Sequence, residues 1–486
     1  MLFNTLKFLL IFPLIFGIHW AIPAKYNQWR KVFLILVSYL LYMNWKPAYA
    51  LVLLGVTLVT YWGGYFLSLE FRDESLKSVE EVSSVKFQVS RRRRRLVLCF
   101  ALLGLLPLLV FKYYNFLNDS LSAGLAAIGL KFSMPGLNWA VPVGISFFTF
   151  QAVGYMLDVY HGRIKAEKNF LDYVLFVSFF PQIAGGPISK ADELLPQIKK
   201  ERTFDYNQAV SGLKYLLWGM FLKVVLADRA GIYVDTVFGT YDKFSGLGCI
   251  IASVLYSIQI YADFAGYSLM AVGIGKTLGF DLINNFKRPY FAATVTEFWK
   301  RWHISLTRWL TQQVYIPLGG SRCSKARNYW NILVTFLVSG IWHGANWTFI
   351  IWGILHGICQ IIEKAFGWNK KQYKGFGRFA RIILTFTIVT LAWTIFRSPS
   401  ITDTIGYFSR FASLSGKLLA EGSVLVYTVL ATIPVLAYEL VREYFPALYS
   451  KLNSKQWVRW MAYLAVFTMI MLLGVFDGSS FIYLSF

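Results

Sequence analysis

Cysteine and histidine are scarce in this chain of 486 residues, which holds four Cys and five His. The cysteines show no CxxC pair and no spacing with histidine that could bind a metal, so we expect neither a metal site nor a disulfide. No GxSxG elbow or Walker A motif occurs in a suitable context, which leaves hydrolase and NTPase functions without support. No internal repeat is visible either, and this argues against a transporter built from paired halves.

Acidic residues are also few: the chain has 25 Asp and Glu against 48 Lys and Arg, for a formal net charge of +23. Such a charge could indicate nucleic-acid binding, but the sequence shows no soluble domain that would carry this function. The basic residues instead fall in short loops between apolar stretches, as the positive-inside rule describes for membrane proteins.

Apolar residues dominate the rest of the chain. Hydrophobic residues make up 56% of it, and the mean hydropathy is +0.50, which is too apolar for a soluble protein. We therefore predict an all-α, polytopic integral membrane protein with about 11–13 transmembrane helices. The first apolar stretch lacks a basic n-region and a clear cleavage site, so we expect it to stay as a transmembrane helix. Twelve apolar stretches can be placed, at 4–23, 33–45, 47–69, 96–118, 139–160, 208–226, 247–272, 329–343, 347–364, 380–397, 424–441 and 458–476.

The distribution of charge predicts how these helices are oriented. One set of alternate loops carries 34 of the 48 basic residues, so these loops are predicted to be cytoplasmic and both termini to face outward. We expect a single transmembrane domain over residues 1–486, with a core of motifs at about 140–365. The C-terminal helices are expected at 380–476, and an outward-facing tail at 477–486.

Two segments depart from simple crossings. Residues 170–189 are apolar but interrupted by Pro and Gly between basic flanks, which favours a re-entrant hairpin whose irregular backbone is buried in protein or lines a cavity. Residues 286–322 mix aromatic and basic residues at helical spacing, with Phe298, Trp302, Leu306 and Trp309/Leu310 on one stripe. This pattern predicts an amphipathic helix that lies at, or dips into, the cytoplasmic face.

Histidine is rare enough for each residue to be considered singly. His343 lies in the stretch SGIWHGANWTF, and an ionisable group at membrane depth is costly unless it is paired or hydrated. The flanking Gly344 and Asn346 could line a water-filled or substrate-filled cavity, although a histidine that ties helices together fits as well. His303 lies on the amphipathic segment, where an interfacial position is the plain alternative. His356 is better explained by a hydrogen bond between helices.

Asp158 and Asp263 are the acids that lie most clearly inside apolar stretches. Either could orient a catalytic group, but hydrogen bonds to neighbouring helices are the commoner outcome. Among the basic residues, Lys300, Arg301 and Arg308 could bind the phosphates of a cytosolic donor, because guanidinium groups meet phosphate oxygens bidentately. Anchoring of the cytoplasmic face is the alternative role for these three.

Several ordered blocks carry a family resemblance. The strings TEFWKRWHISLTRWLTQQVYIPLGGSR and SGIWHGANWTFIIWGILHG, with the earlier VPVGISFFTFQAVGYMLDVY, FVSFFPQIAGGPI and YSIQIYADFAGYSLMAVGIGKTLGF, are similar to the membrane-bound O-acyltransferase (MBOAT) family. The likeness is to the bacterial branch typified by alginate O-acetyltransferase and by the D-alanyl transfer protein of teichoic acids. It covers roughly residues 1–400 in order, and it implies the MBOAT fold.

The resemblance also implies site residues. In this family a histidine of the WHG motif is catalytic, and it falls on His343; a second histidine often implicated with it falls on His303. The donor thioester is expected to enter from the cytosol, and the acyl group to leave on the other side. His343 would act as general base. Asn346, or backbone N–H groups near it, could stabilise the oxyanion, and Asp263 could orient a catalytic group.

The implied function is transfer of an acetyl group from acetyl-CoA, as a substrate and not as a bound cofactor, for O-acetylation of an extracytoplasmic polysaccharide such as alginate. Expected partners are the lipid bilayer, a periplasmic or extracellular SGNH-type acetyltransferase and a polysaccharide biosynthesis complex, and the expected location is the bacterial cytoplasmic (inner) membrane. D-alanyl transfer to teichoic acid from a carrier protein is one alternative. A transporter or flippase without acyl chemistry is another.

The C-terminal tail ends in FIYLSF. Tails with a tyrosine among phenylalanines recur near this branch of the family and imply an acyl relay. The sharper hypothesis is that Tyr483 accepts the acyl group on its phenol and passes it to an extracytoplasmic partner. An ordinary interfacial aromatic tail is the alternative.

Overall fold

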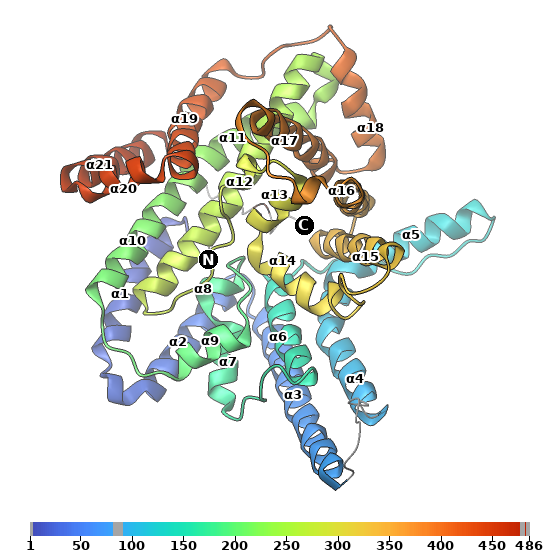
Figure 1. The fold of residues 1–486 in the computed structure, drawn as a ribbon, viewed down its shortest axis with the longest axis vertical. Coiled ribbons are helices and arrows are strands. Elements are labelled where there is room, and N and C mark those ends of the chain that lie inside the picture. The colour runs from blue at the N-terminus through green and yellow to red at the C-terminus, as the bar shows by residue number, and fades with distance from the viewer. Residues whose placement is uncertain (1–2, 81–90, 477–481, 483–486) are drawn as a thin grey trace. The chain divides into compact units, whose positions relative to one another are not determined.

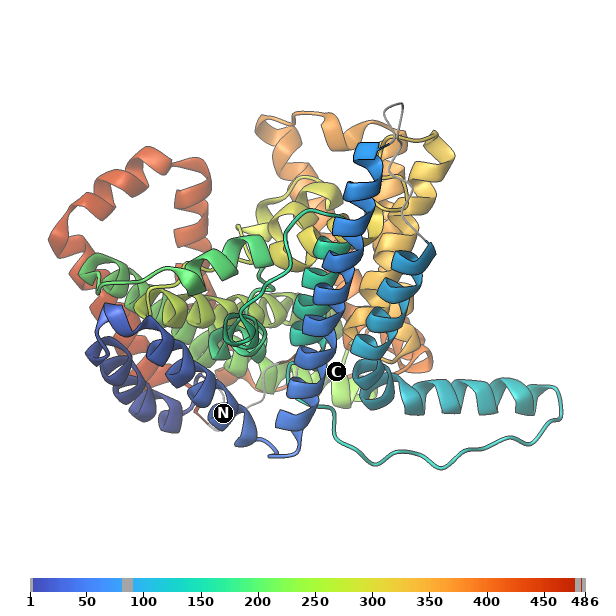
Figure 2. The same cartoon turned by 90° about the horizontal axis from the view of Figure 1, so that it is seen from below.

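The computed structural model describes residues 3–80, 91–476 and 482 of the chain. The regular structure of the described residues is helical (Figures 1 and 2), which confirms the all-α prediction. The chain divides into two compact units. The first contains residues 6–211 and 274–283, and the second contains residues 3–5, 212–273 and the chain from residue 284 onward.

The first unit contains nine complete helices among its described residues. They are α1 (Leu6–Ala21), α2 (Asn27–Met43), α3 (Tyr49–Glu80), α4 (Arg91–Leu108), α5 (Tyr114–Ala127), α6 (Ile145–Tyr160), α7 (Phe170–Ser178), α8 (Phe180–Ile183) and α9 (Ala191–Lys199). Helices α3, α4 and α6 pack against one another. Gly63 makes room for this packing, because a Cβ there would lie 2.7 Å from the sulfur of Met156.

The interrupted apolar segment forms the two short helices α7 and α8, followed by an extended stretch. Its irregular backbone is buried in protein, as the sequence led us to expect, and Gln151 donates from its side chain to the carbonyl of Phe176. Gly144 lies in the left-handed region, with φ of 70°, and a Cβ there would lie 1.7 Å from the carbonyl oxygen of Ile183. Only glycine fits at this approach.

Helix α10 (Tyr206–Met220) begins in the first unit, and helix α12 (Gly246–Thr277) ends there. Both helices belong mostly to the second unit. A π-helical segment, Phe221–Ala227, continues α10 into α11. The helices of the second unit are α11 (Asp228–Gly239), α13 (Val295–Arg301), α14 (Ile304–Leu310), α15 (Lys325–His343), α16 (Trp347–Ala365), α17 (Gly375–Arg397), α18 (Ile401–Ser409), α19 (Gly422–Tyr444), α20 (Pro446–Ser454) and α21 (Gln456–Leu473).

Seven helices of the described chain are long and apolar enough to cross a membrane, or up to eight if α1 and α2, which meet at 104°, form one broken span. The count is lower than the 11–13 helices that we expected. The difference has a structural reason: the expected span at 139–160 contains only the 16 residues of α6. The stretches on either side of His343 form α15 and α16, which include several polar residues and fall outside the count.

The segment at 286–322 is not one amphipathic helix. It forms α13 and α14, and the helical path breaks between them at His303. Phe298, Trp302 and Leu306 do share a side, but each is at most 1% exposed. The predicted stripe therefore faces the interior of the protein.

Candidate active site

His343 is the last residue of α15, and the helical hairpin that carries it is packed unusually tightly. Figure 1 shows α15 beside α16. A Cβ on Gly340 would lie 2.3 Å from the carbonyl oxygen of Phe349, and one on Gly353 would lie 2.4 Å from that of Phe336. Small residues allow two helix backbones to approach this closely. The position of His343 is therefore fixed by backbone contacts one turn away.

The turn of this hairpin is also held by specific contacts. A Cβ on Gly344 would lie 2.1 Å from the ring of Phe349. Asn346 is the N-cap of α16: its side-chain oxygen accepts from the N–H of Thr348 at 3.1 Å, and its amide nitrogen donates to the carbonyl of Pro399 at 2.6 Å. Both ends of the Asn346 amide thus have structural partners, so the geometry favours capping over the oxyanion role considered from the sequence.

Aromatic rings surround the imidazole of His343. The side chain is 2% exposed. Its ring centroid lies 4.9 Å from that of Trp352 on α16 and 5.2 Å from that of Phe396 on α17, both nearly perpendicular to it. In such apolar surroundings a proton transfer or a developing charge interacts more strongly with its neighbours than it would in water.

His303 occupies the break between α13 and α14. Its backbone lies in the left-handed region, with φ of 43°, and its side chain is 0% exposed. Its ring centroid lies 4.6 Å from that of Phe264 and 5.7 Å from that of Trp342, while Trp342 lies 4.9 Å from His343. The structure therefore brings both predicted histidines to the same tryptophan.

Burial also sets the protonation of His303, which lies outside the candidate membrane spans. Desolvation lowers the pKa of His303 to about 3 from its usual value of 6.5. The imidazole is therefore neutral at physiological pH. A neutral ring donates a hydrogen bond from one nitrogen and accepts one at the other, whereas so low a pKa makes it a weak base.

Asn285 braces the strained backbone at His303. Its carbonyl oxygen accepts from the N–H of Ile304, and its side-chain oxygen accepts from the N–H of Ser305, each at 3.0 Å. Non-glycine residues keep a left-handed conformation only where several surrounding contacts hold it in place, and such strained residues are common at functional sites. Sequence reasoning did not single out Asn285, because its partners are about 20 positions away in the chain.

Glu363, near the end of α16, holds the beginning of α13. Its carboxylate accepts from the N–H of Val295 at 2.6 Å and from the N–H of Thr296 at 2.8 Å. A negative charge at a helix N-terminus is stabilising, so this contact ties the helix before His303 to the helix after His343. An acid at the end of an apolar stretch was the signal in the sequence that could have pointed to it.

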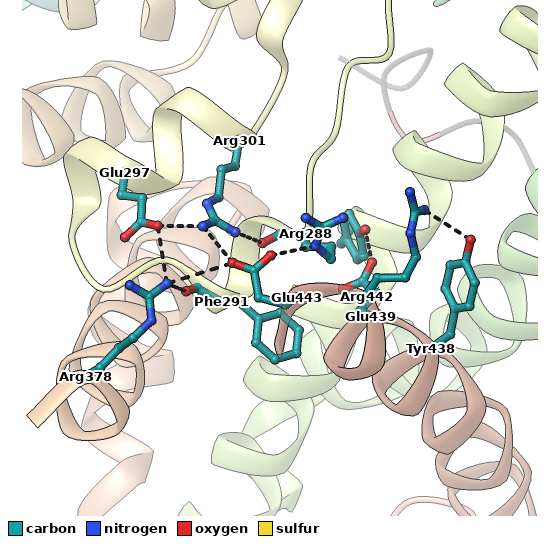
Figure 3. Close-up of polar contacts among 10 residues, drawn as sticks. Arg288, Phe291, Glu297, Arg301, Arg378, Tyr438, Glu439, Arg442 and Glu443 are labelled. Atoms are coloured by element: carbon teal, nitrogen blue, oxygen red, sulfur yellow. Dashed lines mark hydrogen bonds and ion pairs between the residues drawn. The ribbon is translucent and has the colours of Figure 1, made fainter. Parts of the chain in front are cut away.

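Arg301 lies in a network of ion pairs that connects α13 with α17 and α19 (Figure 3). It bonds Glu297 at 2.6 Å and Glu443 at 2.8 Å. Arg288 bonds the other oxygen of Glu443 at 2.6 Å, and Arg378 lies 3.6 Å from Glu297 and 3.8 Å from Glu443. The guanidinium of Arg301 thus already has carboxylate partners, which the sequence did not predict.

The other two residues predicted to bind donor phosphates are placed differently. Lys300 is exposed and Arg308 is half-buried. Arg301 is also half-buried, so Lys300 is the exposed member of the three.

The remaining candidates also have defined places. His356 accepts the indole N–H of Trp299 at 3.3 Å, which confirms the hydrogen bond between helices that we expected. Asp158 pairs with Arg163 at 2.8 Å in the first unit, and Asp263 pairs with Lys223 at 2.6 Å in the second. The predicted acyl-relay residue at position 483 lies outside the described residues.

Comparison with known proteins identifies the family. The family model described as MBOAT, membrane-bound O-acyltransferase family, matches residues 163–401. A "Probable alginate O-acetylase AlgI" of Pseudomonas syringae is 36% identical over 403 residues, which are 82% of this chain and 73% of the relative. This chain belongs to the membrane-bound O-acyltransferase family. The match includes His303 and His343 within its range.

Other relatives of this O-acyltransferase carry different names. A peptidoglycan O-acetyltransferase of Helicobacter pylori is 32% identical, over 87% of this chain and 81% of the relative. A teichoic acid D-alanyltransferase of Bacillus subtilis is 26% identical, over 62% of this chain and 77% of the relative. The chain is therefore a multi-pass membrane acyltransferase.

Proposed function

We propose that this O-acyltransferase moves an acetyl group from cytosolic acetyl-CoA across the bacterial cytoplasmic membrane for O-acetylation of an extracytoplasmic polysaccharide such as alginate. The observation that carries the proposal is the meeting of His303 and His343 at Trp342, inside a buried aromatic cluster. The names of the relatives, an alginate O-acetylase and a peptidoglycan O-acetyltransferase, support acetyl as the group transferred.

His343 acts in this proposal as the general base. Its imidazole takes the proton of a hydroxyl as the oxygen attacks the thioester carbonyl, and the C–S bond then breaks. The departing thiolate of CoA takes a proton back from the imidazolium, so the products are an acetyl ester and free CoA. Such catalysis is worth roughly 10²–10⁴-fold in rate. His303, neutral and close to the same tryptophan, supplies a second hydrogen-bonding group in the cluster.

The first acceptor in this scheme is the phenol of Tyr483. Acetyl-tyrosine then gives up its acetyl group to a hydroxyl of the polysaccharide, directly or through an SGNH-type acetyltransferase outside the membrane. A tail that faces outward, as the charge distribution predicts, is needed for this second step. Lys300 and Arg308 are the exposed and half-buried cations that remain candidates for binding the phosphates of CoA.

The test is the release of CoA from labelled acetyl-CoA by the purified full-length protein. The H343A variant is expected to lose roughly 10²–10⁴-fold in rate, while H161A, which changes an exposed histidine of the first unit, keeps the wild-type rate. Normal turnover by a folded H343A variant would contradict the role of this base. Labelled D-alanine on a carrier protein, offered in parallel, separates the proposed activity from that named for the Bacillus relative.

The relay has its own test. Mass spectrometry of the wild-type protein after incubation with acetyl-CoA is expected to find acetyl-Tyr483. Deletion of residues 483–486 is expected to abolish transfer to the acceptor. Full transfer by the truncated protein, with no acetyl-tyrosine in the wild type, would exclude the relay.

A further inference from the structure

Two pairs of glycines bring α10 and the middle of α12 into close backbone contact. A Cβ on Gly219 would lie 2.6 Å from the carbonyl oxygen of Gly266, and one on Gly266 would lie 2.7 Å from that of Gly219. Seven residues along each helix, a Cβ on Gly273 would lie 2.6 Å from the carbonyl oxygen of Gly212. The two helices are therefore antiparallel and closely packed in this region, as small residues allow.

A buried cluster of charges lies one helical turn further along this contact between the two helices. Lys223, whose side chain is 1% exposed, bonds the carboxylates of Asp228 and Asp263, each at 2.6 Å. Ionised groups buried in apolar spans are rare, are paired with one another, and mark functional sites by default. One ammonium faces two carboxylates here, so the cluster has a formal charge of −1 and capacity to accept further hydrogen bonds.

Lys223 belongs to the π-helical segment Phe221–Ala227. Such segments appear mostly as short interruptions of α-helices, frequently at functional sites. The chain that follows α21 returns to this segment: the N–H of Val475 donates to the carbonyl of Val224 at 2.9 Å. The chain just after the last helix is therefore hydrogen-bonded to the π-helical segment.

Ile482, the described residue of the C-terminal tail, reaches the charged cluster. The main-chain N–H of Ile482 donates to Asp263 Oδ2 at 2.8 Å, while the other oxygen of the same carboxylate bonds Lys223. A carboxylate that accepts a backbone N–H makes a charge-assisted hydrogen bond, which is roughly twice as strong as a neutral one. Because the donor is main chain, the contact fixes the path of the chain at residue 482, whatever its side chain is.

We propose that Asp263, paired with Lys223, is the docking site of the C-terminal tail and thereby a positioning residue for Tyr483, which follows Ile482 in the sequence. The docking stands on the contacts of Asp263 alone, whereas its consequence for Tyr483 rests on the proposed acyl relay. Lys223 offsets the burial cost of the Asp263 carboxylate, whose other oxygen accepts the N–H of Ile482.

Hydrogen exchange tests the docking without reference to acyl transfer. The full-length protein in detergent is compared as wild type, D263A and D228A, and deuterium uptake is followed at the amide of Ile482. D263A is expected to accelerate this exchange about tenfold or more, because a charge-assisted bond is lost. D228A also removes one carboxylate from Lys223 but leaves the acceptor of the tail, so uptake at Ile482 is expected to stay within about threefold of wild type.

A second variant keeps this test decisive if D263A fails to fold. D263N preserves the volume of the side chain and removes its charge, and the exchange at Ile482 is expected to accelerate by about threefold or more. The amide of Val475, which bonds Val224 instead, is the internal reference and is expected to be unchanged. Equal exchange at Ile482 in the wild type and in a folded Asp263 variant would overturn the docking site.

The consequence for Tyr483 is tested by removing the donor itself. I482P lacks the main-chain N–H that bonds Asp263, whereas I482A keeps it, and neither variant replaces a residue of the buried cluster. I482P is expected to form about tenfold less acetyl-Tyr483 than I482A. Equal yields would overturn the positioning role. If the wild type shows protected exchange at Ile482 but forms no acetyl-Tyr483, the relay fails and the docking site stands.

Discussion

His303 combines a buried imidazole with a backbone conformation that L-residues rarely adopt. The left-handed conformation costs a residue with a Cβ roughly 1–2 kcal/mol, and glycine does not pay this cost. We therefore expect H303G to be more stable than H303A by about 1 kcal/mol, while both lack acyl-transfer activity. The thermal unfolding midpoints of the two purified variants measure the difference. A more stable H303A would show that the strain at this position is absent.

The lowered pKa of His303 makes stability depend on pH. Between its usual pKa of 6.5 and the folded value of about 3, the unfolded state binds the proton and the folded state does not. The free energy of unfolding therefore falls as the pH falls through this range. Between pH 7 and 5, wild type is expected to lose up to about 2 kcal/mol more than H303Q.

Unfolding of both proteins over this pH range measures that contribution, since all other titrating groups are shared. The contribution of neutral His303 to the free energy of unfolding is present in full above its usual pKa of 6.5. The stabilities of the two proteins should therefore respond alike between pH 7 and 8. Parallel losses below pH 6.5 would show that His303 is protonated in the folded state.

At the scale of elements, the α15–α16 hairpin positions His343 through glycines that a sequence alone marks only weakly. G340A would place a Cβ 2.3 Å from the carbonyl of Phe349, so the helices must separate. We expect a loss of stability of about 1–3 kcal/mol and a fall in CoA release of tenfold or more, because displacements near 1 Å cost about 10²-fold.

Gly377 on α17 provides a matched control for this prediction. A Cβ there would meet nothing within 4 Å, so G377A is expected to stabilise the protein by about 0.5–1 kcal/mol through helix propensity and to leave activity unchanged. Unfolding midpoints and CoA-release rates of both variants are compared. A G340A variant as active and as stable as G377A would show that the close packing does not hold the site.

Composition predicted the helical class, and the family resemblance, which depends on local strings, implied His303 and His343 as site residues. The sequence could not predict that Trp342 joins His303 to His343, since the contact depends on how α14 and α15 fold together. Nor could it pair Arg301 with Glu443, which lies 142 positions away. The break at His303 was missed for a related reason: the apolar spacing around it continues across the break, while the backbone direction changes.

At the scale of the whole molecule, function depends on which side of the membrane each segment faces. The structure gives α17 as a 23-residue candidate span, followed by the candidate spans α19 and α21. If each of these three helices crosses the membrane, the chain crosses three times from α17 onward. If residues 365–379 are cytoplasmic, as their charge predicts, the tail after α21 faces outward.

Cysteine labelling tests this orientation directly. In a variant whose four natural cysteines are replaced, K370C and L414C place single thiols at exposed positions before α17 and after α18, and Leu414 is 100% exposed. A membrane-impermeant maleimide is expected to label L414C in intact cells, and K370C only after permeabilisation, because basic loops are retained in the cytosol. The reverse pattern would place the tail in the cytosol, where Tyr483 could not deliver an acetyl group to an extracytoplasmic acceptor. The relay would then be excluded even if His343 proved essential for CoA release.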